Sequence, residues 1–326
     1  MARASWGLLW SVGLVCAVGC GGADEPPTYT PVSATSAGSV YTLALGDLKM
    51  VIDASTGARV TEFSLKGKNV LTGPSVDPAN YGSTYWPSPQ SSWCSKGGAC
   101  WPPLAPIDNA PYTGTIDPAT NAIQLTSGTT PIYEFPSSSV TVTKQFAPVA
   151  GGEVDITYTL TNTSPSVSVT VAPWQVSRVQ ATGGLTFFAS PDGSVTYTSG
   201  TDPTFMLTDA SGDLWYDFAT VAANSKANAD GSGWLAHVTQ GHLLYLLTYP
   251  DIQPSQAAPG EAEVEIYTGP SADYLELETQ GALTSVAPGG TLAWTVRWQL
   301  RPVPGGTSVA PGSAALESFT DAQLAQ

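Results

Sequence analysis

Val154-Asp155-Ile156-Thr157-Tyr158-Thr159-Leu160-Thr161 alternates apolar and polar residues without a break. Leu292-Ala293-Trp294-Thr295-Val296-Arg297-Trp298-Gln299-Leu300 repeats this pattern, with two tryptophans and a valine on its apolar face. A period of two places successive side chains on opposite faces of a strand, so both segments are predicted to be half-buried β-strands.

The same pattern recurs along most of the chain and predicts an all-β fold. Turn signals such as Ser55-Thr56-Gly57 and Pro288-Gly289-Gly290 separate the predicted strands. We therefore expect one large antiparallel domain over 37–303, followed by a loose tail over 304–326 in which Ala314–Ala325 forms a short helix. The other predicted strands are 41–53, 58–65, 139–146, 166–172, 185–189, 194–198, 213–219, 233–239, 242–249, 262–268 and 273–279.

The composition excludes some classes of function. The 326 residues carry 11 basic and 26 acidic side chains, for a net charge of −15, which argues against a nucleic-acid partner because phosphates require neutralisation. Two histidines and four cysteines argue against a zinc site. We expect no metal and no cofactor.

The N-terminus has the features of a bacterial export signal over residues 1–20. A charged Arg3 precedes an apolar stretch over 6–18, which is too short to span a membrane, and Cys20 follows in the position of a lipidated cysteine. We expect a membrane-anchored lipoprotein of the cell envelope, in the outer membrane or periplasm, with a flexible tether over 21–36. The alternative is an ordinary secretory signal and a secreted protein.

Cys16 belongs to the predicted signal, and Cys20 is the predicted lipidation site. Cys94 and Cys100 are the two cysteines left for the folded domain. They flank a Gly-Gly turn, and an oxidising compartment favours a disulfide between them that staples the loop. A metal site without further ligands and a free thiol are the alternatives.

The least regular segment, 73–114, is rich in aromatic residues, including Trp86, Trp93 and Trp101. A long loop inside a compact domain is often functional. Exposed indole rings stack on the C–H faces of sugars, which predicts a carbohydrate site. The alternative is that these rings form a small satellite core beneath the loop.

Tyr274-Leu275-Glu276-Leu277-Glu278-Thr279-Gln280 predicts a strand with its two glutamates on one face and its two leucines on the other. Two carboxylates on one face repel each other, so burial would raise the pKa of at least one and make it a candidate general base. Glu261, Glu263 and Glu265 alternate in the same way and are candidates to lie beside them. The alternative is a solvated acidic face. His237 and His242 flank a predicted hairpin turn, where a catalytic role competes with a merely polar one.

Several segments, taken in their order along the chain, resemble those of the galactose mutarotase-like superfamily. They are most similar to a branch of mutarotase-like domain proteins of unknown function. The resemblance spans about 41–301. It implies a large antiparallel β-supersandwich that binds sugars in a concave cleft. The segments that carry it are Gly57-Ala58-Arg59-Val60 with Asn69-Val70-Leu71, Tyr85-Trp86-Pro87-Ser88-Pro89-Gln90-Ser91-Ser92-Trp93, Trp101-Pro102-Pro103, Thr161-Asn162-Thr163-Ser164, Ala172-Pro173-Trp174, the strands over 262–280, and Ala287-Pro288-Gly289-Gly290 before Trp294 and Trp298.

In aldose 1-epimerases the general base is the glutamate of a Leu-Glu-Thr-Gln motif, so the resemblance implies that Glu278 is the base. The acid of these enzymes is histidine, and the matching places here lack one. His237, Lys144 or a tyrosine would have to replace it.

Three functions follow from these expectations. The first is carbohydrate binding, with stacking by Trp86, Trp93, Trp101 and Trp174 and polar contacts from Gln90, Arg59, Lys144, Arg178, Glu276 and Glu278. The second is an aldose epimerase-like enzyme that uses Glu278 as base. The third is a structural envelope lipoprotein without a sugar ligand.

Overall fold

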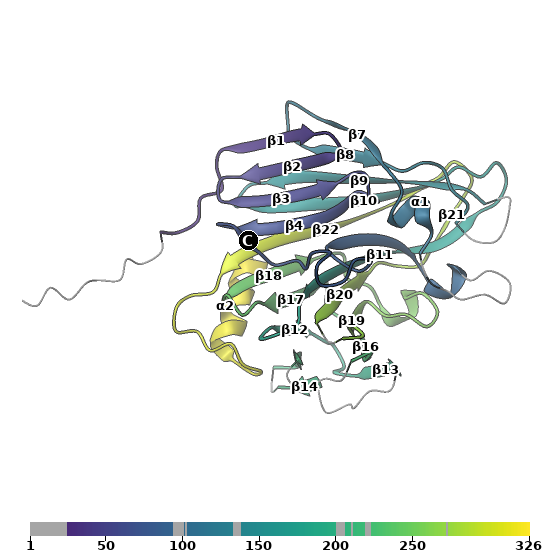
Figure 1. Ribbon diagram of the computed structural model, residues 1–326. Helices are drawn as coiled ribbons and strands as arrows, with labels where there is room; N and C mark the ends of the chain where they lie inside the picture. Colours follow the sequence, from purple (N-terminus) through teal and green to yellow (C-terminus); the bar gives the residue numbers. More distant parts are fainter. Residues whose placement is uncertain are drawn as a thin grey trace, which may run out of the picture.

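The computed structural model describes residues 25–93, 101, 103–132, 138–199, 206–209, 211–218, 223–271 and 273–326. In this part of the chain the strands form two antiparallel sheets that pack face to face (Figure 1). This confirms the predicted all-β sandwich. Within the same residues, no helix is both long enough and apolar enough to cross a membrane.

The 12-stranded sheet has the order β1-β2-β3-β4-β6-β11-β20-β19-β16-β13, with β5 and β21 paired to β4 and β11. Its strands are β1 (Val32–Ala37), β2 (Val40–Leu45), β3 (Leu48–Asp53), β4 (Arg59–Leu65), β5 (Lys68–Asn69), β6 (Ser83–Ser88), β11 (Val169–Gln180), β13 (Val195–Ser199), β16 (Lys226–Ala229), β19 (Val264–Thr268), β20 (Tyr274–Gln280) and β21 (Thr284–Val286).

The 10-stranded sheet has the order β14-β15-β12-β17-β18-β22-β10-β9-β8-β7. Its strands are β7 (Thr113–Ile116), β8 (Ile123–Thr126), β9 (Val140–Val149), β10 (Glu153–Asn162), β12 (Leu185–Ala189), β14 (Met206–Thr208), β15 (Asp213–Asp217), β17 (Trp234–Val238), β18 (Leu243–Thr248) and β22 (Thr291–Pro302). The helical segments are η1 (Gln90–Trp93), α1 (Ala105–Asp108), η4 (Pro254–Gln256) and α2 (Ala314–Leu324).

The main core lies between the two sheets and follows from the alternating pattern. On β10 the apolar residues are buried, and Val154 pairs with Trp298 across β10 and β22. The ring of Trp298 meets Phe63 from the opposite sheet, with 5.2 Å between the ring centroids. The alternation thus gives each sheet one apolar face, and burial of these faces against each other holds the sandwich together.

The predicted domain boundaries differ from the structure at both ends. Residues 32–36, expected in a flexible tether, belong to β1, which pairs with β2 along its length. The tail expected to be loose contains α2, and Leu316 on this helix is fully buried against Phe187 and its neighbours on the outer face of the 10-stranded sheet. The short helix itself was predicted, but its apolar side covers a sheet and is therefore fixed in place.

The segment 73–114 also differs from its expected irregular form. It contains β6, a central strand of the 12-stranded sheet between β4 and β11. All residues of Ser83–Ser88 are buried, so this strand shows little alternation of polarity and was missed.

Candidate functional site

A cavity of about 360 Å³ lies over the outer face of the 12-stranded sheet. On β20, Leu275 and Leu277 point into the main core, so Glu276 and Glu278 point to the opposite face and line the cavity. This confirms the predicted division of that strand into an apolar and an acidic face. The lining residues are Asn80, Trp86, Gln90, Trp101, Trp174, Lys226, Tyr267, Pro270, Tyr274, Glu276 and Glu278.

Cross-strand pairing gathers the acidic groups. Glu265 on β19 lies directly opposite Glu278 on β20, and both side chains are fully buried. Lys226, from β16, reaches both carboxylates: its Nζ lies 2.5 Å from Oε2 of Glu265 and 3.2 Å from Oε2 of Glu278. Its Nζ also lies 5.1 Å from the centre of the Trp174 ring. A single ammonium group therefore serves two buried carboxylates.

Burial and neighbouring charges shift the pKa values of Glu278, Lys226 and Glu261. Burial raises the pKa of Glu278 well above its usual range, and the carboxylate of Glu265 raises it further, although Lys226 opposes the shift. Burial lowers the pKa of Lys226, but Glu278 and Glu265 outweigh it and the net shift is upward. Burial and Glu265 together raise the pKa of Glu261 to about 7. Lys226 thus stays charged, while Glu278 and Glu261 hold their protons more strongly than ordinary glutamates.

A second ion pair lies beside the first. Arg178 on β11 and Glu276 on β20 are opposite each other, and Nε of Arg178 lies 2.9 Å from Oε1 of Glu276. The guanidinium group also donates to Oγ1 of Thr84 and lies 4.8 Å from the centre of the Trp86 ring. Arg178 and Glu276, both predicted as ligand contacts, are thus each other's partners, and Arg178 supports Trp86.

The four predicted stacking tryptophans form one cluster. The centroid of Trp86 lies 5.5 Å from that of Trp93, 5.3 Å from that of Trp101 and 5.2 Å from that of Trp174. Trp101 is 44% exposed, whereas the other three rings are buried. The cluster is therefore both a satellite core and a wall of the cavity, which Trp86, Trp101 and Trp174 line and Trp93 supports from behind.

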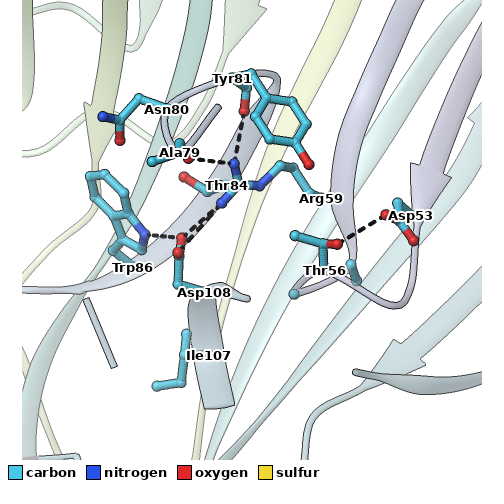
Figure 2. Close-up of polar contacts among 12 residues, drawn as sticks. Asp53, Thr56, Arg59, Ala79, Asn80, Tyr81, Thr84, Trp86, Ile107 and Asp108 are labelled. Atoms are coloured by element: carbon cyan, nitrogen blue, oxygen red, sulfur yellow. Dashed lines mark hydrogen bonds and ion pairs between the residues drawn. The ribbon is translucent and has the colours of Figure 1, made fainter. Parts of the chain in front are cut away.

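A buried polar network fixes Trp86 in place. Its Nε1 donates to Oδ1 of Asp108 at 2.7 Å, and Nη2 of Arg59 lies 3.4 Å from Oδ2 of the same aspartate (Figure 2). Nη1 of Arg59 donates to the carbonyl groups of Ala79 and Tyr81, the neighbours of cavity-lining Asn80. Arg59, predicted as a ligand contact, thus holds two walls of the cavity without lining it.

Two predicted residues lie elsewhere. His237 on β17 belongs to the 10-stranded sheet and is fully buried there, with its Nδ1 2.9 Å from Oγ1 of Thr186. Burial lowers its pKa to about 3. Lys144 on β9 is also buried in that sheet, where its Nζ donates to the carbonyl group of Gly57 at 2.6 Å. Neither lines the cavity, so neither lies where it could act as the acid that complements Glu278.

The last predicted residues to place are Gln90 and the three cysteines. Gln90 lines the cavity, and its backbone N–H donates to Oε1 of Glu261 at 2.8 Å. Cys20, Cys94 and Cys100 lie outside the described residues, so the predicted lipidation and disulfide stay predictions.

The sequence patterns do not predict Lys226, Tyr267, Asn80 or Asp108 as members of the site. Lys226-Ala227-Asn228-Ala229 alternates polar and apolar residues, which could have marked a short strand. Nothing in that pattern places the strand beside β19, and without this neighbour Lys226 has no visible partner.

One group of carboxylates within the described residues has the spacing of metal ligands. Asp209, Asp213 and Glu317 place their oxygens within 4.8 Å of one another. Hydrogen bonding to Asp209 raises the pKa of Glu317 to about 7, and Asp209 also accepts from Nε1 of Trp215 at 2.8 Å. Asp209 and Glu317 therefore have partners within the protein, and the group lies on other elements than the cavity.

No protein-family model matches the chain, and no curated protein matches it by sequence. Its fold, in contrast, is shared with solved structures. A galactose mutarotase-like protein from Clostridium acetobutylicum superposes on 86% of this chain and 100% of its own, with a TM-score of 0.51 and 11% identity. The fold is mutarotase-like.

Two further structures match the fold of the chain to a similar extent. The GalM/aldose epimerase homologue from C. elegans covers 84% of this chain and 99% of its own, with a TM-score of 0.51 and 10% identity. The Slr1438 protein from Synechocystis sp. PCC 6803 covers 86% and 99%, with a TM-score of 0.51 and 13% identity. This mutarotase-like likeness concerns the fold, since at such identities the site residues must be argued from their own geometry.

Proposed function

We propose that the chain binds a carbohydrate in the cavity on the outer face of the 12-stranded sheet. The observation that carries the proposal is the joining of aromatic and acidic walls in one cavity of about 360 Å³. This volume lies in the range of small-ligand sites. The mutarotase-like fold supports a sugar as the ligand.

The two walls suit the two kinds of surface on a sugar. The exposed ring of Trp101, with Trp86 and Trp174 beside it, offers π-faces to C–H groups. Glu278, Asn80 and Gln90 offer acceptors and donors for hydroxyl groups.

Saturation-transfer NMR and calorimetry on the chain from Gly21 would test binding, with common hexoses and disaccharides as probes. Trp101→Ala should weaken binding by about tenfold, because the variant loses one stacked ring. Leu207→Ala is the matched control, since Leu207 is exposed to a similar extent and lies in the other sheet. Equal affinities in the two variants would contradict the proposed site. If no sugar binds, a structural lipoprotein is favoured.

A second candidate function is interconversion of sugar anomers, favoured by the buried Glu278 with its raised pKa. In this reaction the anomeric hydroxyl group gives its proton to Glu278, the bond from C1 to the ring oxygen breaks, and that oxygen takes a proton from an acid. Closure on the other face of the aldehyde then gives the other anomer. Tyr267 and Tyr274 line the cavity, and burial raises the pKa of both, so their phenols keep a proton to donate.

NMR of freshly dissolved α-glucose and α-galactose separates the two candidates. An epimerase accelerates equilibration, and Glu278→Gln abolishes the acceleration while binding survives. Glu62→Gln, a change at a partly exposed glutamate paired with Lys49, should leave the rate unchanged. Binding without acceleration would leave the first candidate alone.

We further propose that the chain is exported, anchored through a lipid on Cys20, and stapled by a Cys94–Cys100 disulfide. The apolar stretch before Cys20 and the Gly-Gly turn between the other two cysteines support this. Incorporation of an alkyne-bearing fatty acid into the full chain in bacteria, and its loss in Cys20→Ser, would test the anchor. Mass spectrometry of the unreduced protein would test the disulfide.

A further inference from the structure

Carboxylates outnumber cations at the floor of the cavity, within the residues that the structure describes. Of the charged side chains that line it, Glu276 and Glu278 are acidic and Lys226 is the cation, while Glu265 lies behind Lys226 and Arg178 pairs with Glu276. Glu265 and Glu278 are fully buried, where water does little to screen their charge. The floor is therefore short of positive charge.

Both cations are already committed. Arg178 is held by Glu276 and by Thr84. Lys226 is shared between Glu265 and Glu278 and lies closer to Glu265. Neither is left over to bind an anionic group of a ligand.

Glu278 keeps an acceptor for the ligand. Oε1 of Glu278 is buried and accepts no hydrogen bond from the described residues, although Glu278 lines the cavity. A buried carboxylate oxygen without a donor is costly, and a donor from a ligand would remove that cost. Burial also raises the pKa of Glu278 and Lys226 only partly offsets this shift, so a further positive charge from a ligand would favour the ionised carboxylate.

The walls favour a cation as well. The rings of Trp86, Trp101, Trp174 and Tyr267 line the cavity, and aromatic faces attract ammonium groups. The Nζ of Lys226 over Trp174 is such a contact within the protein. A ligand ammonium group would thus meet both a carboxylate oxygen and π-faces.

We propose that the cavity selects amino sugars, sugars that carry a protonated amine, over neutral and acidic ones. This specificity rests on the sugar-binding function proposed above. The ammonium group donates to Oε1 of Glu278 and supplies the positive charge that the floor lacks. Uronic acids and sugar phosphates are disfavoured by the same excess of carboxylates.

Calorimetry at pH 6.5 on the chain from Gly21 tests this specificity. Glucosamine, galactosamine and mannosamine would each be compared with the hexose that has a hydroxyl group in place of the amine, and with glucuronate and glucose 6-phosphate. We expect at least one amino sugar to bind about tenfold more tightly than its hexose, which is the worth of a charge-assisted hydrogen bond.

Two variants with opposite expected effects distinguish a change in ligand preference from a loss of protein structure. Glu278→Gln keeps the shape but removes the charge, and should reduce the preference for the amine to less than about twofold. Lys226→Gln removes the competing cation and should increase the preference. Glu62→Gln should leave it unchanged, since Glu62 pairs with Lys49 away from the cavity.

The possible results separate the two proposals. If hexoses bind as tightly as their amino counterparts, or acidic sugars bind best, the amino-sugar specificity is overturned and sugar binding stands. If none of these sugars binds, sugar binding and its specificity both fail. A preference for the amine that survives in a folded Glu278→Gln variant would overturn the role of Glu278.

Discussion

Two lysines among the residues that the structure describes are largely buried, and their surroundings differ in one respect. Lys144, from the 10-stranded sheet, donates to the carbonyl groups of Gly57 and Ala58, and its Nζ lies 5.3 Å from the ring centre of Tyr112. Lys226, from the 12-stranded sheet, lies between Glu265 and Glu278. One has neutral partners and the other has carboxylates.

The pKa values of the two lysines move in opposite directions. Burial lowers the pKa of Lys144 to about 7, although the nearby Asp108 opposes the shift. Burial acts on Lys226 too, but the two glutamates outweigh it and its pKa rises. Burial alone therefore does not make a charged site. The charge of the partners decides whether a buried lysine stays ionised and can organise a cavity.

Replacement of Lys226 should change the stability of the protein more than any other substitution considered below. Lys226→Met leaves Glu265 and Glu278 buried without their shared cation, which should reduce the free energy of unfolding by about 3–5 kcal/mol. Urea unfolding at pH 7 measures this change.

The control is Lys49→Met. Lys49 pairs with Glu62 at 2.8 Å, but its side chain is 45% exposed. Its loss should cost less than about 1 kcal/mol, because water screens the pair. Similar losses in the two variants would mean that Lys226 acts as an ordinary surface charge, and the contrast between the lysines would disappear.

The next effect is a pH dependence carried by Lys144. In the unfolded chain its pKa is the ordinary 10.5, and in the folded protein it is about 7. Between these values the unfolded state binds more protons, so the free energy of unfolding rises with pH, by at most about 1.4 kcal/mol per pH unit. Below pH 7 both states are protonated and this contribution is constant.

Urea unfolding at several pH values between 7 and 10 would measure the slope, and Lys144→Met should flatten it. Lys226 contributes with the opposite sign and in another range. Its folded pKa is raised, so its stabilisation is present below pH 10.5 and is lost at higher pH. A slope that persists in Lys144→Met would assign the pH dependence to another group.

The smallest effect is expected from a change at Asp108. The carboxylate of Asp108 opposes the lowering of the pKa of Lys144 by burial. Asp108→Asn should lower the pKa of Lys144 further, because it removes the nearby negative charge that favours the ammonium form. NMR titration of lysines labelled with ¹³C at Cε measures the midpoint directly. An unchanged or raised midpoint would show that Asp108 does not act on Lys144.

The fold and half of the site could be predicted from local patterns. The alternation on β10 and β22 predicted the sandwich, and the alternation Leu275-Glu276-Leu277-Glu278 predicted an acidic face that the structure confirms. Both depend only on the period of a strand. Strands that are buried on both faces lack this signal, which is why β6 was missed.

The other half of the site depends on the order of strands, which local patterns do not contain. Lys226 belongs to the site only because β16 lies beside β19. Lys144 and His237 were candidates by residue type, yet both belong to the other sheet. Arg178 and Glu276 were predicted to bind a ligand, but they lie opposite each other and pair.

Gly57 connects Lys144 to the cavity. Its carbonyl group binds Lys144, its N–H donates to the carbonyl group of Ala110, and a side chain here would lie 1.9 Å from the backbone oxygen of Asp108. Asp108 in turn holds Nε1 of Trp86. Deprotonation of Lys144 near pH 7 removes a positive charge that acts on Asp108, the carboxylate that holds an indole ring of the other sheet. Trp86 becomes an intrinsic optical reporter, and the near-ultraviolet circular dichroism of the unliganded protein should titrate with that lysine.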